Sequence, residues 1–373
     1  TITVGAHWAR TGLRTAFGDT LYDTSVRPGD LAVFSSRGPT VDGRIKPDVV
    51  APGTNIISVN AQHAPGLGWG EYNQYYMYYG GTSMAAPLVA GAAALVRDYY
   101  IDKLLVASPS AALIKASLIN TAVDITGYGN PLYEGGQPIP NMHEGWGRIN
   151  VGAATAIGTG EFVDARTGLG TGESQQWAFP VPYARPFKVT LVWNDKEAAP
   201  EATKALVNNL DLEVTAPDGT LYRGNAFSGG WSIAGGIADT INNVENVYIQ
   251  TPAVGTWQVR VKGTNVPQGI AGKQPFALVV DQQAPVVQSI SPNMGLNDDV
   301  LHDVLVQGSY LLDAQSVRLV KEAVAIPGTI RSTSETQLTV DFDLTGKTPG
   351  VYDLEVATFF GAHKLGQAFT VLD

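Results

Sequence analysis

A single serine, Ser83, lies where a glycine turn meets a helix-forming stretch. It follows Gly80, Gly81 and Thr82 and opens a run of small apolar residues that continues to about Tyr99. A serine hydroxyl becomes a nucleophile only when a base takes its proton. The unpaired N–H groups and positive dipole end of a helix N-terminus favour the negative charge that develops in such chemistry. The pattern therefore indicates either a nucleophile or an ordinary helix N-cap, a position that serine often takes.

Strands and helices alternate around this serine. We expect short buried strands at residues 1–6 and 48–53, and helices at residues 83–99 and 111–122. Such alternation predicts an α/β layer with a mainly parallel sheet and helices on both of its faces. Because the chain opens directly on one of these strands, we expect the layer to be part of a larger fold.

The two expected helices differ in their apolar pattern. The helix at 83–99 carries alanine and glycine on all sides, which predicts that it is buried all round. The helix at 111–122 has one apolar stripe, formed by Ile114, Leu118 and Ala122. A Ser-Pro-Ser segment before it supplies cap residues and an early proline.

From about residue 160 the helical period disappears. Strands are expected at 188–194, 210–220, 242–249 and 255–263, with alternating apolar and polar side chains in the last. Several such strands separated by turn signals predict an all-β sandwich or jelly roll.

A linker at 281–292 leads into a last segment of short alternating strands, which predicts a small immunoglobulin-like sandwich. The expected domains are therefore 1–157, 158–283 and 284–373, an α/β part followed by two all-β parts.

The composition argues against several classes of function. The net charge is -10 and there is no run of Lys and Arg, which argues against a nucleic-acid partner. No run of 18 apolar residues occurs, so no membrane span is expected. The absence of cysteine leaves no disulfide framework; it fits a secreted bacterial protein that folds without disulfides and equally fits a cytosolic one. The chain opens on a strand without a start methionine, so we expect it to enter inside a domain.

Three ordered segments resemble the subtilisin-like serine proteases, the subtilases. Residues 80–96 resemble their catalytic-serine segment, residues 34–58 the segment before it, and residues 141–150 a stretch near the end of the catalytic domain. The resemblance implies that Ser83 is the nucleophile of a serine endopeptidase that cuts protein or peptide substrates through an acyl-enzyme. It also implies that the N–H of Ser83 is one oxyanion donor.

The later domains carry weaker resemblances. Segments of 158–283 look like the β-sandwich that follows the protease domain in oxidatively stable alkaline subtilases. Residues 284–373 resemble the IPT/TIG immunoglobulin-like modules of surface and secreted proteins. Together these resemblances imply an extracellular, bacterial protein.

The other members of the family's triad do not match. The family places its Asp in an Asp-Thr/Ser-Gly turn and its His in a His-Gly-Thr segment, both before the serine, and neither occurs upstream of Ser83. We expect each histidine to be an ordinary loop or surface residue: His7, His63, His143, His302 and His363.

We therefore expect the Asp, the His and the oxyanion Asn on a segment missing from this chain, carried by the same protein or by a separate chain. On that view the chain alone is inactive. The alternative is a non-catalytic binding or adhesive protein on a degenerate protease scaffold.

No cofactor is required for this chemistry, although structural calcium fits the family. Asp195 and Asp211 are the candidate ligands, because they lie in clusters of carboxylates and amides. The other interpretation is that Asn and Asp simply form turns there. The tyrosine-rich segment 67–81 either lines a peptide-binding cleft or packs under a long loop.

Overall fold

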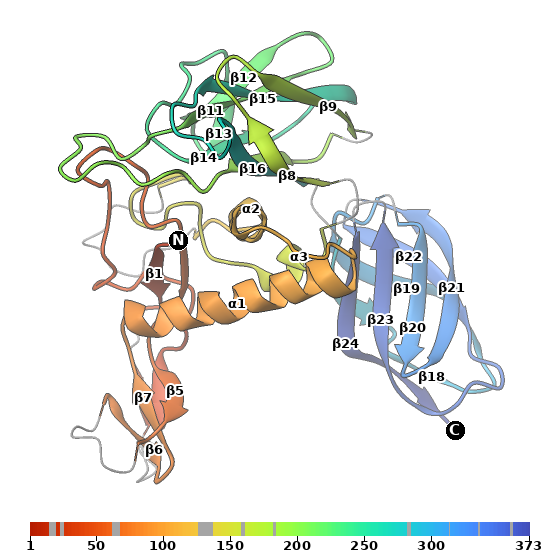
Figure 1. Ribbon diagram of the computed structural model, residues 1–373. Coiled ribbons are helices and arrows are strands. Elements are labelled where there is room, and N and C mark those ends of the chain that lie inside the picture. Colours follow the sequence, from red (N-terminus) through yellow and green to blue (C-terminus); the bar gives the residue numbers. More distant parts are fainter. Residues whose placement is uncertain are drawn as a thin grey trace. The chain divides into compact units, whose positions relative to one another are not determined.

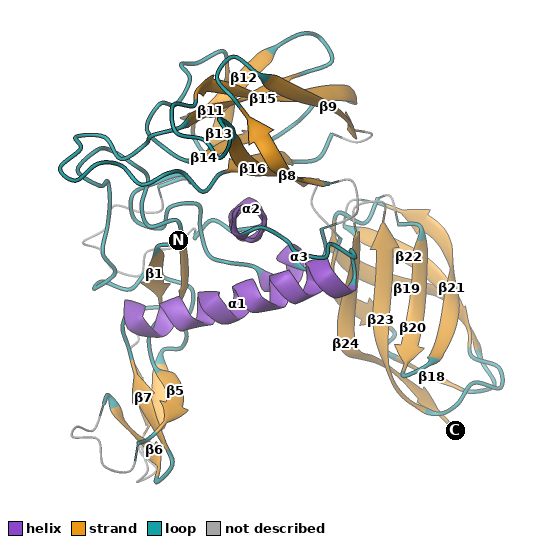
Figure 2. Cartoon of the chain, viewed as in Figure 1, coloured by secondary structure: helices purple, strands orange, loops and turns teal. Residues whose placement is uncertain are grey.

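The computed structural model describes residues 1–14, 20–22, 26–61, 68–125, 137–157, 161–181, 184–281, 285–312, 314–334, 336–358 and 361–373. They form two compact units. The first holds residues 1–155, 162–184 and 188–280, and the second consists mainly of residues 281–373. With 48% strand and 11% helix, the chain is mostly β, and the helices drawn in Figures 1 and 2 all lie in the first unit. The two first predicted domains thus share one compact unit, and the domain boundaries stay predictions.

The first 155 residues hold the helices and several short strands. In order these elements are β1 (Val4–His7), β2 (Gly12–Arg14), β3 (Thr20–Tyr22), β4 (Val49–Pro52), β5 (Ile56–Val59), β6 (Gly70–Asn73), β7 (Tyr76–Tyr79), α1 (Thr82–Asp102), α2 (Ala111–Asn120) and α3 (Val151–Ala154).

Strands β1 and β4 pair in parallel, with Val4 opposite Val49 and Ala6 opposite Ala51. Helix α1 packs against both strands. This is the arrangement that strand–helix alternation favours. The wider parallel sheet, with helices on both faces, stays a prediction.

Helix α1 is buried on one face only, which corrects the prediction of burial all round. Its buried residues are Ala85, Val89, Ala92, Val96 and Tyr100. On its other side Leu88 and Leu95 are 42% and 58% exposed. Small residues on all sides make burial possible, but packing partners decide it.

Helix α2 shows the reverse difference, because all its residues from Ala112 to Asn120 are buried rather than one stripe. Its N-cap is Ser110, whose hydroxyl accepts a hydrogen bond from Leu113 N at 2.9 Å. Figure 1 draws α2 between α1 and strand β8 (Phe162–Leu169), and both elements contact it.

Two sheets form the rest of the first unit. One has the order β14-β10-β16-β8 and the other β13-β12-β11-β15-β9. Their remaining strands are β9 (Ser174–Val181), β10 (Phe187–Val192), β11 (Asn209–Thr215), β12 (Leu221–Ser228), β13 (Trp231–Ala234), β14 (Val244–Ile249), β15 (Gly255–Asn265) and β16 (Gln274–Asp281). The rings of Trp177 and Phe276 meet edge to face across the two sheets, with ring centroids 6.2 Å apart, a separation typical of aromatic pairs. The jelly-roll connectivity stays a prediction.

The helical part and these sheets share one core. Trp146, 1% exposed, packs its ring against Phe227 and Tyr248 of the sheets. The buried Asn120 of α2 donates to Thr190 Oγ1 at 2.9 Å. Because these side chains are buried by each other, the sheets complete the core around the helices.

The second unit is one eight-stranded, nearly closed sheet with the order β17-β19-β22-β21-β20-β23-β24-β18. Its strands are β17 (Val286–Ser291), β18 (Met294–Leu296), β19 (Val300–Ser309), β20 (Ser316–Lys321), β21 (Val324–Thr333), β22 (Gln337–Asp343), β23 (Gly350–Thr358) and β24 (Gly361–Leu372). Its core includes Phe342, Tyr352 and Phe369. The immunoglobulin-like IPT/TIG assignment is not confirmed.

Candidate active site

Ser83 is the second residue of α1, and its side chain is exposed. The N-cap of the helix is Gly81, which provides no side-chain cap. The N-cap interpretation of Ser83 is therefore wrong, because another residue occupies that position. Within the described part of the chain, the Ser83 hydroxyl has no hydrogen-bond partner. An exposed hydroxyl with no structural task is available for chemistry.

The first turn of α1 leaves its N–H groups open. Gly81 O accepts hydrogen bonds from Met84 N at 3.0 Å and Ala85 N at 3.4 Å. The N–H groups of Thr82 and Ser83 precede these donors and have no acceptor within the helix. They lie at the positive end of the helix dipole, which favours an anion beside Ser83. No acidic side chain lies in the first turn to occupy this position.

Two glycines fix the turn that presents Ser83. Gly81 has φ 142° and ψ 162°, a backbone conformation that L side chains rarely adopt. Its N–H donates to Gly53 O at 2.7 Å. A Cβ on Gly53 would lie 2.4 Å from the Cβ of Ala6, so the close approach of β1, β4 and the turn requires glycine there.

A buried charge cluster supports the start of β4. Asp48 accepts from Lys46 Nζ at 2.7 Å, and Lys115 Nζ of α2 lies 2.9 Å from the same oxygen. Its other oxygen accepts from Thr3 N at 2.8 Å. Burial raises the pKa of Asp48, but the two lysines outweigh it and the pKa lies below its usual range. Burial lowers the pKa of Lys115. Buried charges of this kind are tolerated only when paired.

The four described histidines lie in different elements of the chain. His7 is 4% exposed in β1, which corrects its expected loop or surface position. Its Nδ1 lies 3.0 Å from Trp8 O, and burial lowers its pKa. His143 lies in a turn, and His302 and His363 lie in the second compact unit. His63 lies outside the described residues. Among the described residues no histidine is hydrogen-bonded to Ser83.

An aromatic group adjoins the turn before Ser83. The three strands β5-β7-β6 form a small sheet that leads directly into that turn. Trp69, just before β6, lies with its ring edge to face against Phe34, with ring centroids 6.1 Å apart. Of the tyrosines, Tyr78 is 2% exposed, whereas Tyr75 is 59% exposed. The tyrosine-rich segment thus both packs and faces solvent.

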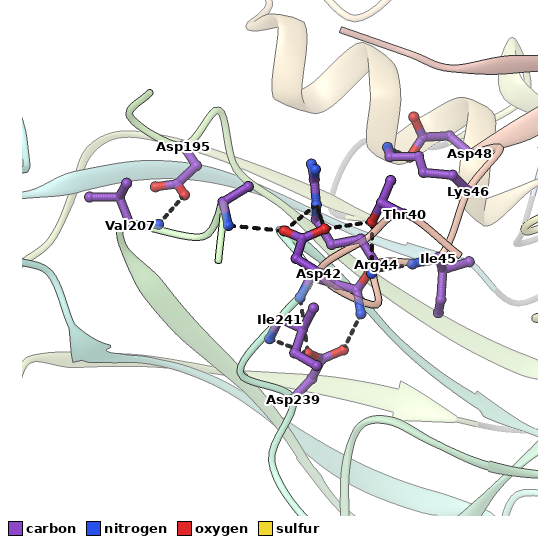
Figure 3. Close-up of polar contacts among 12 residues, drawn as sticks. Thr40, Asp42, Arg44, Ile45, Lys46, Asp48, Asp195, Val207, Asp239 and Ile241 are labelled. Atoms are coloured by element: carbon purple, nitrogen blue, oxygen red, sulfur yellow. Dashed lines mark hydrogen bonds and ion pairs between the residues drawn. The ribbon is translucent and has the colours of Figure 1, made fainter. Parts of the chain in front are cut away.

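The two calcium candidates are both engaged in hydrogen bonds. Figure 3 shows Asp195 beside Val207, whose N–H donates to it at 2.7 Å, and Asn208 N also donates to it. Asp211 accepts from Asn209 Nδ2 at 3.0 Å and from Thr264 Oγ1 at 2.5 Å. Among the described residues, no three His, Cys, Asp or Glu side chains are grouped to hold a metal ion. Calcium binding at Asp195 and Asp211 stays a prediction.

Figure 3 also shows a polar contact between the helical part and the sheets that sequence reasoning did not find. Asp42 accepts from Ala205 N at 2.9 Å, and Asn242 Oδ1 accepts from Ile45 N at 2.9 Å. Asp239 in turn accepts from Asn242 Nδ2 at 2.7 Å. The loop that precedes β4 is therefore held by the sheets. No local sequence pattern marks such a contact, because its partners lie more than 150 residues apart.

Comparisons with known proteins find relatives of this chain among the serine proteases. Residues 1–147 match the model of Peptidase_S8, the subtilase family. A serine protease/ABC transporter B family protein, tagA of Dictyostelium discoideum, is 32% identical over 280 residues, covering 67% of this chain and 15% of that protein. The minor extracellular protease Vpr of Bacillus subtilis is 42% identical over 98 residues, or 26% of this chain and 10% of Vpr.

The chain thus spans a small part of the length of these curated relatives. Among solved structures, that of tripeptidyl peptidase 2 aligns with 95% of this chain and with 36% of the peptidase chain. The sequence identity is 13% and the TM-score is 0.22, so the likeness is weak. No helix in the described residues is long and apolar enough to cross a membrane.

The part of the chain that matches the subtilase family, residues 1–147, contains Ser83 and the glycine turn before it.

Proposed function

We propose that this chain is the nucleophile-bearing part of a subtilisin-like serine endopeptidase. Ser83 attacks the carbonyl carbon of a peptide bond, and its own N–H donates to the oxyanion that forms. The general base takes the hydroxyl proton of Ser83 and gives it to the amine that leaves as the C–N bond breaks. Water then hydrolyses the acyl-enzyme to a free carboxylic acid and restores Ser83. The observation that carries this proposal is the position of Ser83, exposed at the second residue of α1 behind a glycine N-cap.

A general base is needed to complete the site. We propose that the His, the Asp and the oxyanion Asn come from a segment outside these 373 residues. The exposed apolar side of α1 supports this, because Leu88 and Leu95 are exposed to solvent on a helix that otherwise carries mostly small residues. Apolar surface of this kind is commonly covered by another part of a protein. Ser83 without a base keeps at most the binding and oxyanion contributions.

The substrate class follows from the chemistry, and we propose protein or peptide chains. Two relatives that align with this chain bear the names of proteases, one of them extracellular. We also propose an extracellular protein of bacterial origin. Structural calcium, at Asp195 and Asp211 or elsewhere, belongs to the same proposal, because secreted proteases of this kind gain from a cation held by oxygen ligands.

The test is covalent labelling of the full-length natural protein by a fluorophosphonate. We expect one label, on Ser83, lost in Ser83→Ala. The matched control is Ser58→Ala, because Ser58 is also exposed and close in sequence, and it should keep the label. The 373-residue chain alone should stay unlabelled. A folded full-length protein that takes up no label supports the non-catalytic alternative.

A further inference from the structure

Trp69 is held against the turn that leads to Ser83. A Cβ added to Gly80 would lie 1.8 Å from Cη2 of the Trp69 ring, so the indole rests directly on the Gly80 backbone. Gly80 is three residues before Ser83. Three residues span at most about 11 Å of chain, so the indole touches the backbone at a point no farther than that from Ser83.

The indole is fixed in place and still open to solvent. Trp69 N donates to Tyr78 O at 2.8 Å, which fixes its backbone to β7. The ring of Phe34 meets it at an interplanar angle of 80°. Trp69 nevertheless remains 42% exposed and Phe34 41% exposed. A rigid aromatic surface loses little entropy when it binds another group.

We infer that Trp69 is a specificity-determining residue that receives a large apolar side chain of the peptide substrate. An extended peptide advances about 3.3 Å per residue. The side chain in question therefore belongs to a residue within about three positions of the bond that is cut. This inference rests on the proposed function of Ser83.

Gly80 has a second role on this view. Without a side chain it lets the indole lie flat against the backbone, and any larger residue would push the ring away. Gly68, with φ 56°, similarly lets the chain pass close to the ring of Tyr79, at 3.2 Å from a notional Cβ. The rings of Phe34 and Trp69 thus form one aromatic surface beside the turn.

The experiment uses the full-length natural protein and labelled nonapeptides of alanine in which one phenylalanine is moved through all positions. We expect kcat/KM to favour phenylalanine at one position within three residues of the cut. In Trp69→Ala that preference, measured as the ratio of kcat/KM for the phenylalanine peptide to kcat/KM for the all-alanine peptide, should fall roughly tenfold. Trp69→Phe should keep most of the preference. Tyr75→Ala, at the exposed tip of the same hairpin, should keep all of it.

Binding of the same peptides to the Ser83→Ala variant, read by fluorescence anisotropy, gives a result that does not depend on cleavage. Adding Trp69→Ala to that variant should weaken the phenylalanine peptides selectively. An equal loss for every peptide, or no loss, overturns the role of Trp69 provided that the thermal melt is unchanged. If the wild-type protein binds these peptides through Trp69 but neither cuts nor labels, the proposed function fails and the binding role stands.

Discussion

The N–H of Gly81 donates to the carbonyl oxygen of Gly53 at 2.7 Å. This contact joins the end of β4 to the turn that precedes Ser83, and it ties the position of Ser83 to the backbone of β4. The position of Ser83 therefore depends on glycines whose conformation or close packing excludes a side chain.

Substitution of the first of these glycines should damage the site. In Gly81→Ala the residue must keep φ 142°, a strain of about 1–3 kcal/mol. We expect a lower free energy of unfolding in urea and loss of labelling at Ser83. The matched control is Gly91→Ala in the middle of α1, where a Cβ meets nothing within 4 Å. That variant should gain about 0.5–1 kcal/mol, and a loss there would contradict the account.

The charge cluster at Asp48 should respond unequally to removal of its partners. Asp48→Asn leaves Lys115, 4% exposed, without its carboxylate, and we expect a loss of about 3–5 kcal/mol. Lys115→Met should cost less, because Asp48 keeps Lys46. Urea unfolding of both variants decides this, and an equal or reversed order would count against it.

The same carboxylate gives the protein an acid-sensitive contribution. The folded pKa of Asp48 lies below its ordinary value of 3.8. Its contribution to stability is therefore fully present above about pH 4 and is lost as the pH falls through the lowered folded value. Melting curves between pH 6 and pH 2, whatever else titrates, should fall less steeply for Asp48→Asn than for the wild type.

Glu245 should act in the opposite direction. It is buried, its Oε2 accepts from Leu212 N at 2.7 Å, and burial raises its pKa well above 4.5. The folded state therefore holds a proton that the unfolded state releases, so stability falls as the pH rises from 4.5 toward the raised value. Glu245→Gln should remove this slope and be the more stable protein at pH 8. Parallel pH profiles for variant and wild type would refute the assignment.

The contact between the helical part and the sheets should contribute to the stability of both. Asn242→Ala removes the acceptor of Ile45 N and the donor to Asp239, at a cost of about 1–3 kcal/mol. Asp218→Ala is the control, because Asp218 only caps an exposed turn through Thr220 N, and its effect should be much smaller. Hydrogen exchange of the loop at 38–47 should increase in the first variant alone.

Local sequence determined several elements around Ser83, and its role as a nucleophile stays a prediction. The Gly-Gly-Thr-Ser order placed a helix start at Ser83, and the helix begins at Thr82. The Ser-Pro-Ser segment predicted the cap that Ser110 forms, and the valines of β4 predicted a buried strand. These features depend on neighbours within a few residues, so they can be read from the chain alone.

Only the tertiary structure decided which faces are covered. The small-residue helix α1 was expected to be buried all round and has an exposed face, whereas α2 was expected to show one stripe and is buried at every residue from Ala112 to Asn120. Contacts between segments far apart in the sequence also bury His7 in β1, and the fold of the hairpin brings the Trp69 ring against Gly80. Whether a helix face is buried depends on elements far away in sequence. The periodic pattern shows that a face is apolar, but it does not show which element, if any, packs against it.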